Sequence, residues 1–143
     1  MPQETIFLPV LAMAALTFFV LMFIPLRRFR AVFARDLTPD DFALGESDRV
    51  SAHVALANRN YMNLLEMPVL FYAVCVAMFV TGTVDSLAVN LAWVYVALRV
   101  AHSLVHLSFN HVITRVSLFA ASNFAVIALW VVFGARIWER AAG

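Results

Sequence analysis

The sequence contains no lysine, and its ten basic residues are all arginine. Nine acidic residues balance them, which leaves a formal net charge of +1 at pH 7. Proteins that bind nucleic acid carry a strong basic patch or stripe, so this balance predicts no nucleic-acid partner. The chain also has a single cysteine, Cys75, which excludes an intrachain disulfide. Because Cys75 lies inside an apolar run, we expect its thiol to pack as a small apolar group.

Charged residues make up only 13% of the chain and hydrophobic residues 64%, a composition outside the range of soluble domains. The apolar excess is concentrated in four long segments, each near the ~20 residues needed to cross a ~30 Å hydrocarbon core. We therefore predict an all-α, multi-pass membrane protein that forms a single domain over residues 1–143. The expected helices cover residues of about 6–26, 59–80, 86–109 and 116–138.

A polar connection of about residues 27–58 separates the first two expected helices. It begins with Arg27, Arg28 and Arg30, and basic residues next to a span are typical of the cytoplasmic side. Arg136 and Arg140, near the C-terminus, oppose this orientation, but the three arginines outweigh them. We therefore expect both termini on the non-cytoplasmic side, in the inner membrane of a bacterium.

Two local signals accompany these segments. Thr38, directly before Pro39, is a candidate N-cap for a short helix inside the connection. The connection as a whole either covers a site at the membrane surface or is a solvated linker. In the second helix, Pro68 has no amide hydrogen and frees the carbonyl of Leu64, so we predict a local kink beside Glu66.

The second expected helix opens with three polar residues on one face. At 100° per residue, Asn63 and Glu66 lie at about 40° and −20° from Arg59. A carboxylate that faces hydrocarbon without a partner is costly, so this face must look at protein or at a polar cavity.

The third expected helix carries a matching polar face. His102, His106 and Asn110 lie at about −60°, −20° and 20° from Arg99. If the helices alternate in direction, this face and that of the second helix lie at similar depth, with Arg115 close to both. Glu66 can then pair with Arg99 or Arg59, and a bare Glu66–Arg99 pair that sets helix register is the simpler alternative.

His102 and His106 also have the i, i+4 spacing of a helical metal site. No glutamate of an H-E-x-x-H motif lies between them, and no cysteine or carboxylate on their face completes a ligand set. We therefore expect no metal at these histidines.

On these residues the chain resembles the MAPEG family, the membrane-associated proteins in eicosanoid and glutathione metabolism. The resemblance rests on the four spans, on the basic connection after the first, and on a motif R-x-x-x-N-x-x-E that opens the second. That motif stands here as Arg59, Asn63 and Glu66, and Arg115 matches the arginine that opens the fourth span.

The resemblance implies a left-handed four-helix bundle, assembled as a homotrimer that binds glutathione as co-substrate between subunits. Arg59, Asn63 and Glu66 would bind the tripeptide together with Arg99, and the glutamate would take its amino group. Arg115 would stabilise the glutathione thiolate.

Two residues depart from the family pattern. His102 and His106 stand where the enzymes often have tyrosines, so any catalytic role of those tyrosines would pass to histidine.

Two functions follow as hypotheses. The first is a glutathione-dependent transferase or peroxidase, with Arg115, His102 and His106 as catalytic residues. Its partners would be membrane lipid and a lipophilic small-molecule substrate. The second is a non-catalytic lipid or small-molecule binder that uses the same cleft, as the family also includes a binder of this kind.

Overall fold

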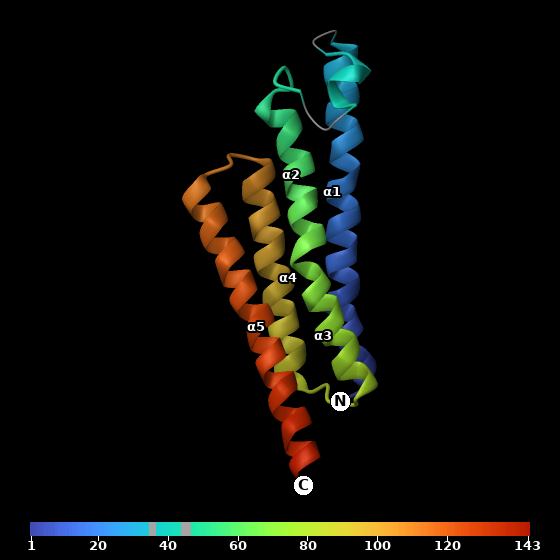
Figure 1. Ribbon diagram of the computed structural model, residues 1–143, viewed down its shortest axis with the longest axis vertical. Helices are drawn as coiled ribbons and strands as arrows, with labels where there is room; N and C mark the ends of the chain where they lie inside the picture. Colours follow the sequence, from blue (N-terminus) through green and yellow to red (C-terminus); the bar gives the residue numbers. More distant parts are fainter. Residues whose placement is uncertain (35–36, 44–46) are drawn as a thin grey trace.

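The computed structural model describes residues 1–34, 37–43 and 47–143, and its regular structure within these ranges is helical throughout (Figure 1). The elements, in chain order, are η1 (Gln3–Ile6), α1 (Phe7–Phe33), η2 (Pro39–Phe42), α2 (Ala52–Glu66), α3 (Pro68–Val80), α4 (Ser86–Leu107) and α5 (Val112–Ala142).

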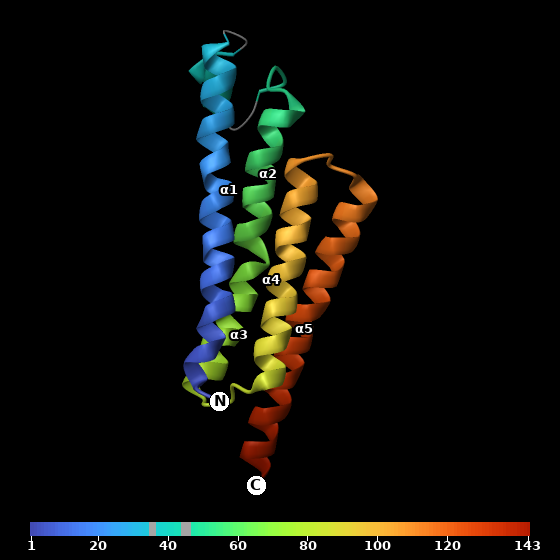
Figure 2. The same ribbon diagram turned by 180° about the vertical axis from the view of Figure 1, so that it is seen from behind.

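Within the described residues, four stretches are long and apolar enough to cross a membrane, which confirms the predicted all-α, four-span bundle. They are Gln3–Phe33, Ala52–Val80, Ser86–Leu107 and Val112–Ala142. Successive spans alternate in direction, so both chain ends lie at one end of the bundle (Figure 1). The short turn between α4 and α5 and the connection between α1 and α2 lie at the other end (Figures 1 and 2). We call this second end the loop end.

The predicted bounds of the first connection need correction. α1 continues to Phe33 rather than ending near residue 26, and α2 begins at Ala52 rather than at Arg59. The arginines after the apolar run stay helical because Arg27 has carbonyl partners inside the bundle. Its guanidinium donates hydrogen bonds to the carbonyl oxygens of His53 (2.7 Å) and Leu107 (3.1 Å), which joins α1 to α2 and α4.

The connection that remains contains the short helix η2. Thr38 is its N-cap residue, as predicted, and the Thr38 amide donates a hydrogen bond to Asp41 Oδ2 at 2.8 Å. That amide, with the Ser47 hydroxyl, holds the pKa of the Asp41 carboxyl below its usual value. Residues 35–36 and 44–46 of the predicted connection lie outside the described residues.

At Pro68, where the sequence predicts a kink, the second span divides into two helices, since α2 ends at Glu66 and α3 begins at Pro68. Met67 between them keeps helical backbone angles, with φ −64° and ψ −34°. The second span therefore continues through the break as one path, and only its hydrogen-bond ladder is interrupted.

Between this break and the end of the bundle that carries the chain termini, close packing of α1, α3, α4 and α5 forms the core. Phe71 stacks on Tyr95 with ring centroids 4.5 Å apart, and both side chains are fully buried. Ala88 and Ala92, also fully buried, let α4 approach its neighbours closely, as small residues do in membrane bundles. Cys75 is buried in the same cluster, in line with its expected apolar role.

The termini are fixed to the turn between α3 and α4. The side chain of Gln3 donates a hydrogen bond from Nε2 to the Val84 carbonyl oxygen (3.1 Å), and its Oε1 accepts one from the backbone amide of Val84 (2.9 Å). Arg136 donates to the Thr83 carbonyl and pairs with Asp85, while Arg140 donates to the carbonyl oxygens of this same turn. Cations thus complement the free carbonyls at the end of α3.

We predict that Asp85 stabilises the fold by two separable interactions. Its side chain caps α4 by accepting a hydrogen bond from the Ala88 amide at 2.9 Å, and it also pairs with Arg136. D85N should keep the cap and lose the ion pair, whereas D85A loses both. Unfolding in mixed micelles titrated with sodium dodecyl sulfate should place D85A about 1 kcal/mol below D85N. Equal stability of the two variants would contradict the capping role.

Candidate functional site

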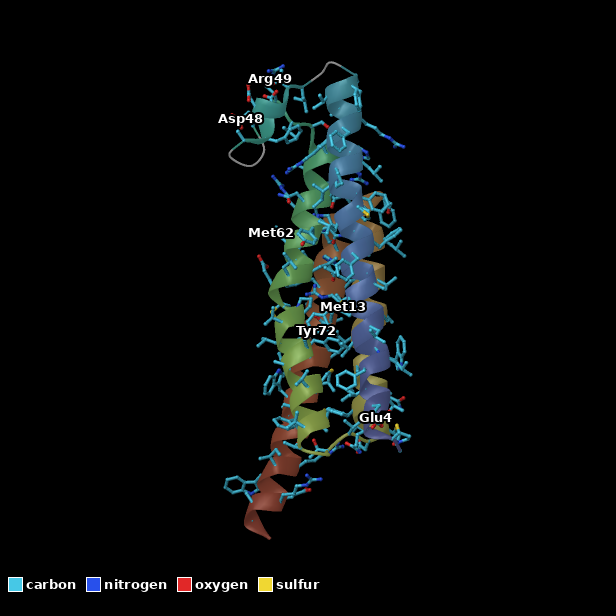
Figure 3. The ribbon with its side chains drawn as sticks, turned by 90° about the vertical axis from the view of Figure 1, so that its right-hand side faces the viewer. Glu4, Met13, Asp48, Arg49, Met62 and Tyr72 are labelled. Atoms are coloured by element: carbon cyan, nitrogen blue, oxygen red, sulfur yellow. The ribbon has the colours of Figure 1, made fainter. Side chains whose placement is uncertain are left out.

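A cavity of about 430 Å³ opens at the loop end of the bundle, between α2, α4 and α5. Met62, one of its lining residues, lies on α2 between the Asp48–Arg49 segment and Tyr72 (Figure 3). The volume falls within the ~300–1,000 Å³ of small-molecule sites. The lining residues are Asn58, Arg59, Met62, Asn63, His102, His106, Arg115, Val116 and Phe119.

Five of the seven predicted site residues therefore line one cavity. Arg59 and Asn63 come from α2, His102 and His106 from α4, and Arg115 from the first turn of α5. The antiparallel course of α2 and α4 brings their polar faces to the same depth, as expected from the sequence. Arg59 and Arg115 both present guanidinium groups, and none of the described lining residues is a carboxylate, so the cavity has positive electrostatic character.

Arg115 is held by two neighbours at the turn between α4 and α5. Its Nη1 donates to Asn110 Oδ1 at 2.7 Å and approaches His106 Nε2 at 3.5 Å. A guanidinium can only donate, so His106 Nε2 serves as the acceptor in this weak contact. The remaining donors of Arg115 are available to a ligand in the cavity.

Asn110 does not line the cavity but holds Arg115 there, a role that its predicted place on the polar face of the third helix did not indicate. It lies beyond the end of α4 at Leu107, not on the helix face predicted to reach residue 109. Its φ of 47° is left-handed, a conformation that asparagine tolerates better than most residues. The backbone amide of Asn110 donates a hydrogen bond to the Val105 carbonyl oxygen at 2.8 Å, which closes the end of α4. The signal available in the sequence was an asparagine at the junction of two helical patterns.

Arg99 lies behind the cavity rather than in its wall. Its side chain is fully buried, with Nε donating to the Tyr95 hydroxyl and Nη2 to the Asn63 carbonyl, both at 3.1 Å. The guanidinium carbon also lies 5.2 Å from the ring centre of Phe119. Nη1 has no hydrogen-bond partner within the described part of the chain. The buried charge is thus solvated by a carbonyl, a hydroxyl and aromatic faces.

Glu66 does not form the predicted ion pair with Arg99 or Arg59. Glu66 and Arg59 are both exposed, and neither side chain has a hydrogen bond or ion pair to any described residue. Arg99 is turned inward to Asn63 and Tyr95, and this orientation explains why the pair is not formed within the chain. A register-setting Glu66–Arg99 pair is therefore excluded for the single chain, and the carboxylate faces outward from the bundle.

A second polar contact joins α2 to α4 and was also missed. Ser103 Oγ donates to Asn60 Oδ1 at 3.3 Å, and both side chains are buried. Asn60 precedes Asn63 by three residues, so its side chain is offset by about 60° around α2, and there it is buried against α4 instead of lining the cavity. Its polar character gave no direct sign of this burial.

Comparison with known proteins places these residues in a family context. The MAPEG family model matches residues 6–135, which include every predicted site residue. None of the curated proteins and none of the solved structures that were compared matches the chain.

We predict that Asn110 has separate backbone and side-chain roles. N110G keeps the left-handed turn but removes the acceptor for Arg115, whereas N110A removes the acceptor and also strains the backbone. N110A should therefore be less stable than N110G by about 1 kcal/mol. Chemical unfolding of both variants in detergent measures the difference. If N110A were as stable as N110G, the positive φ would not be a constraint in solution.

Proposed function

The chain belongs to the MAPEG family, and we propose that it is a membrane glutathione-dependent transferase or peroxidase that acts on lipophilic electrophiles. The family links it to glutathione or eicosanoid metabolism in the membrane. The observation that carries the finer proposal is the single cavity in which Arg59, Asn63, His102, His106 and Arg115 meet.

The charge of the cavity suits glutathione. This tripeptide carries two carboxylates and one ammonium group, so a pocket with two arginines and no carboxylate favours its anionic part. Arg59 has no hydrogen bond or ion pair to a described residue. Its planar guanidinium can therefore donate two parallel hydrogen bonds to the two oxygens of a ligand carboxylate. Asn63 adds an amide from the next turn of the same helix.

Glu66 would bind the ammonium group from the flank of the cavity. It follows Asn63 by three residues on α2, so the two side chains are neighbours on the helix surface. An unpaired carboxylate at this depth of a span is costly in lipid, and an ammonium partner offsets that cost. Arg99, buried behind Asn63, would act by holding the Asn63 carbonyl rather than by touching the ligand.

Arg115 would supply the chemical activation. A free thiol has a pKa of about 8.5, and a close guanidinium favours the thiolate. In transfer, the sulfur forms a bond to the electrophilic carbon, the leaving group departs with its electron pair, and the thiol proton passes to a base. In the peroxidase reaction two glutathione thiols form a disulfide, and a hydroperoxide becomes an alcohol and water.

His102 and His106 are the candidate proton carriers. Each lines the cavity, and the Nδ1 atom of each is buried with no hydrogen-bond partner in the described ranges. Their rings meet edge to face, with centroids 5.5 Å apart. Each histidine can therefore carry a proton, or orient glutathione through a hydrogen bond to a ring nitrogen. In either role the imidazole takes the place of the tyrosine hydroxyl of related enzymes.

We further propose that the functional unit is a homotrimer. The outer face of α2 and α3 around Glu66 is apolar and exposed, with Met62 48%, Leu65 43% and Val69 59% accessible. A neighbouring copy would cover this face, enclose Glu66, and complete the cavity on its open side. The family is generally trimeric, which supports this proposal. The exposed carboxylate of Glu66 is a further reason to expect that a second copy covers this face.

The cavity end would face the cytoplasm, where glutathione is abundant in cells that make it. Arg27 and Arg30 lie at this end. The opposing arginines at the other end are compensated, because Arg136 pairs with Asp85 and Arg140 donates to turn carbonyls. The positive-inside rule counts arginines whether or not they are paired, and Arg27, Arg28 and Arg30 at the cavity end still outnumber Arg136 and Arg140.

The test of the proposed chemistry is R115Q, which keeps a polar side chain but removes the charge. Turnover of glutathione with a lipophilic aryl halide should fall about 100-fold, because the thiolate loses its electrostatic stabilisation. KM for glutathione should change little, and the pH at which the rate rises should move upward. Unchanged turnover would exclude Arg115 as the activator. Glutathione binding without turnover in the unmodified protein would instead favour the non-catalytic binder.

A second variant tests the ammonium contact. E66Q should weaken glutathione binding about tenfold, since a charge-assisted hydrogen bond is replaced by a neutral one. N-acetylglutathione, which lacks the ammonium group, should bind E66Q and the unmodified protein equally. Calorimetric titration of both ligands measures the four affinities. An equal loss for both ligands would show that Glu66 supports the site by structure and not by binding the amine.

A further inference from the structure

A second groove lies at the loop end, on the other side of α2 from the candidate site. Its volume is about 450 Å³, and it is formed by the last turns of α1 and the first turn of α2. α1 and α5 lie at opposite edges of the bundle (Figures 1 and 2), so this groove does not belong to the cavity beside α5. Nothing in the proposed chemistry uses it.

Among the described residues that line the groove, two are arginines and none is a carboxylate. Arg27 is half-buried and donates to the carbonyls of His53 and Leu107, which fix its position but leave its charge uncompensated. Arg30, one turn further along α1, is exposed and has no hydrogen bond or ion pair to any described residue. Two positive charges about one helical turn apart, that of Arg27 fixed and that of Arg30 free to adjust, match the oxygens of one phosphate.

The same groove has an apolar half on its membrane side. Phe23 and Leu26 precede Arg27 on α1, within the run that spans the hydrocarbon core. Arg27 and Arg30 follow that run directly, at the depth where lipid head groups lie. Ser51, at the start of α2, adds a hydroxyl donor on the opposite wall. The occupant should therefore have an anionic head and an apolar tail.

We propose that this groove, lined by Phe23, Leu26, Arg27, Arg30 and Ser51, binds the phosphate head group of an anionic phospholipid. The guanidinium groups of Arg27 and Arg30 contact the phosphate oxygens, and Phe23 and Leu26 contact the first methylene groups of the acyl chains. Basic pockets between membrane helices bind anionic lipids in this way. Arg27 also joins α1, α2 and α4, so a bound lipid stabilises the helix contacts around the loop end.

Native mass spectrometry of the purified protein, titrated with phosphatidylglycerol or phosphatidylcholine, tests this assignment. The unmodified protein should retain phosphatidylglycerol in preference to phosphatidylcholine. R30Q should reduce phosphatidylglycerol retention about fivefold, because one basic residue near an anionic lipid surface changes the binding affinity by about this factor. R30K, which keeps the charge without the planar fork, should lose less. Because Arg30 is exposed and unpaired, these variants should fold normally.

R59Q is the matched control, because Arg59 is also an exposed, unpaired arginine of the loop end but lines the other cavity. It should retain phosphatidylglycerol like the unmodified protein. Equal retention of the two lipids, or an equal loss in R59Q and R30Q, would overturn the groove as the site. Displacement of the lipid by millimolar inorganic phosphate would show that the groove binds free phosphate rather than a lipid.

Discussion

The burial of Arg99 is the interaction on which the loop end of this bundle depends. A guanidinium inside a membrane protein must replace its water by fixed polar partners, because the desolvation cost is large. Here Tyr95 supplies a hydroxyl, α2 supplies the Asn63 carbonyl, and Phe119 of α5 supplies an aromatic face. One buried charge thus sets the spacing of three helices, and the cavity forms beside it.

The same requirement explains the polar groups at both ends of the molecule. Arginine side chains at both ends donate hydrogen bonds to backbone carbonyls. Arg27 does so at the loop end, while Arg136 and Arg140 do so at the turn between α3 and α4. Arg30, Arg59 and Glu66 are among the exposed charged residues that have no hydrogen bond or ion pair in the described ranges, and each marks a surface where we propose a ligand or a second copy.

Much of this arrangement could be read from the sequence, because span length and helical periodicity are local properties. The apolar runs identify the four spans, and the spacing of Asn63 and His106 predicts their shared depth. The inward turn of Arg99 could not be predicted, because it depends on how α2 and α4 rotate against each other. That residues 27–33 continue the first helix could not be predicted either, because the carbonyl partners of Arg27 are distant in the chain.

The central claim is that the cavity beside α5 binds glutathione as a thiolate. The most direct measurement is the melting temperature of the detergent-purified protein with millimolar glutathione, together with its absorbance near 240 nm, where thiolates absorb. We predict a higher melting temperature and a new thiolate band at neutral pH. No stabilisation and no band would contradict the account and leave the cavity to a different anionic ligand.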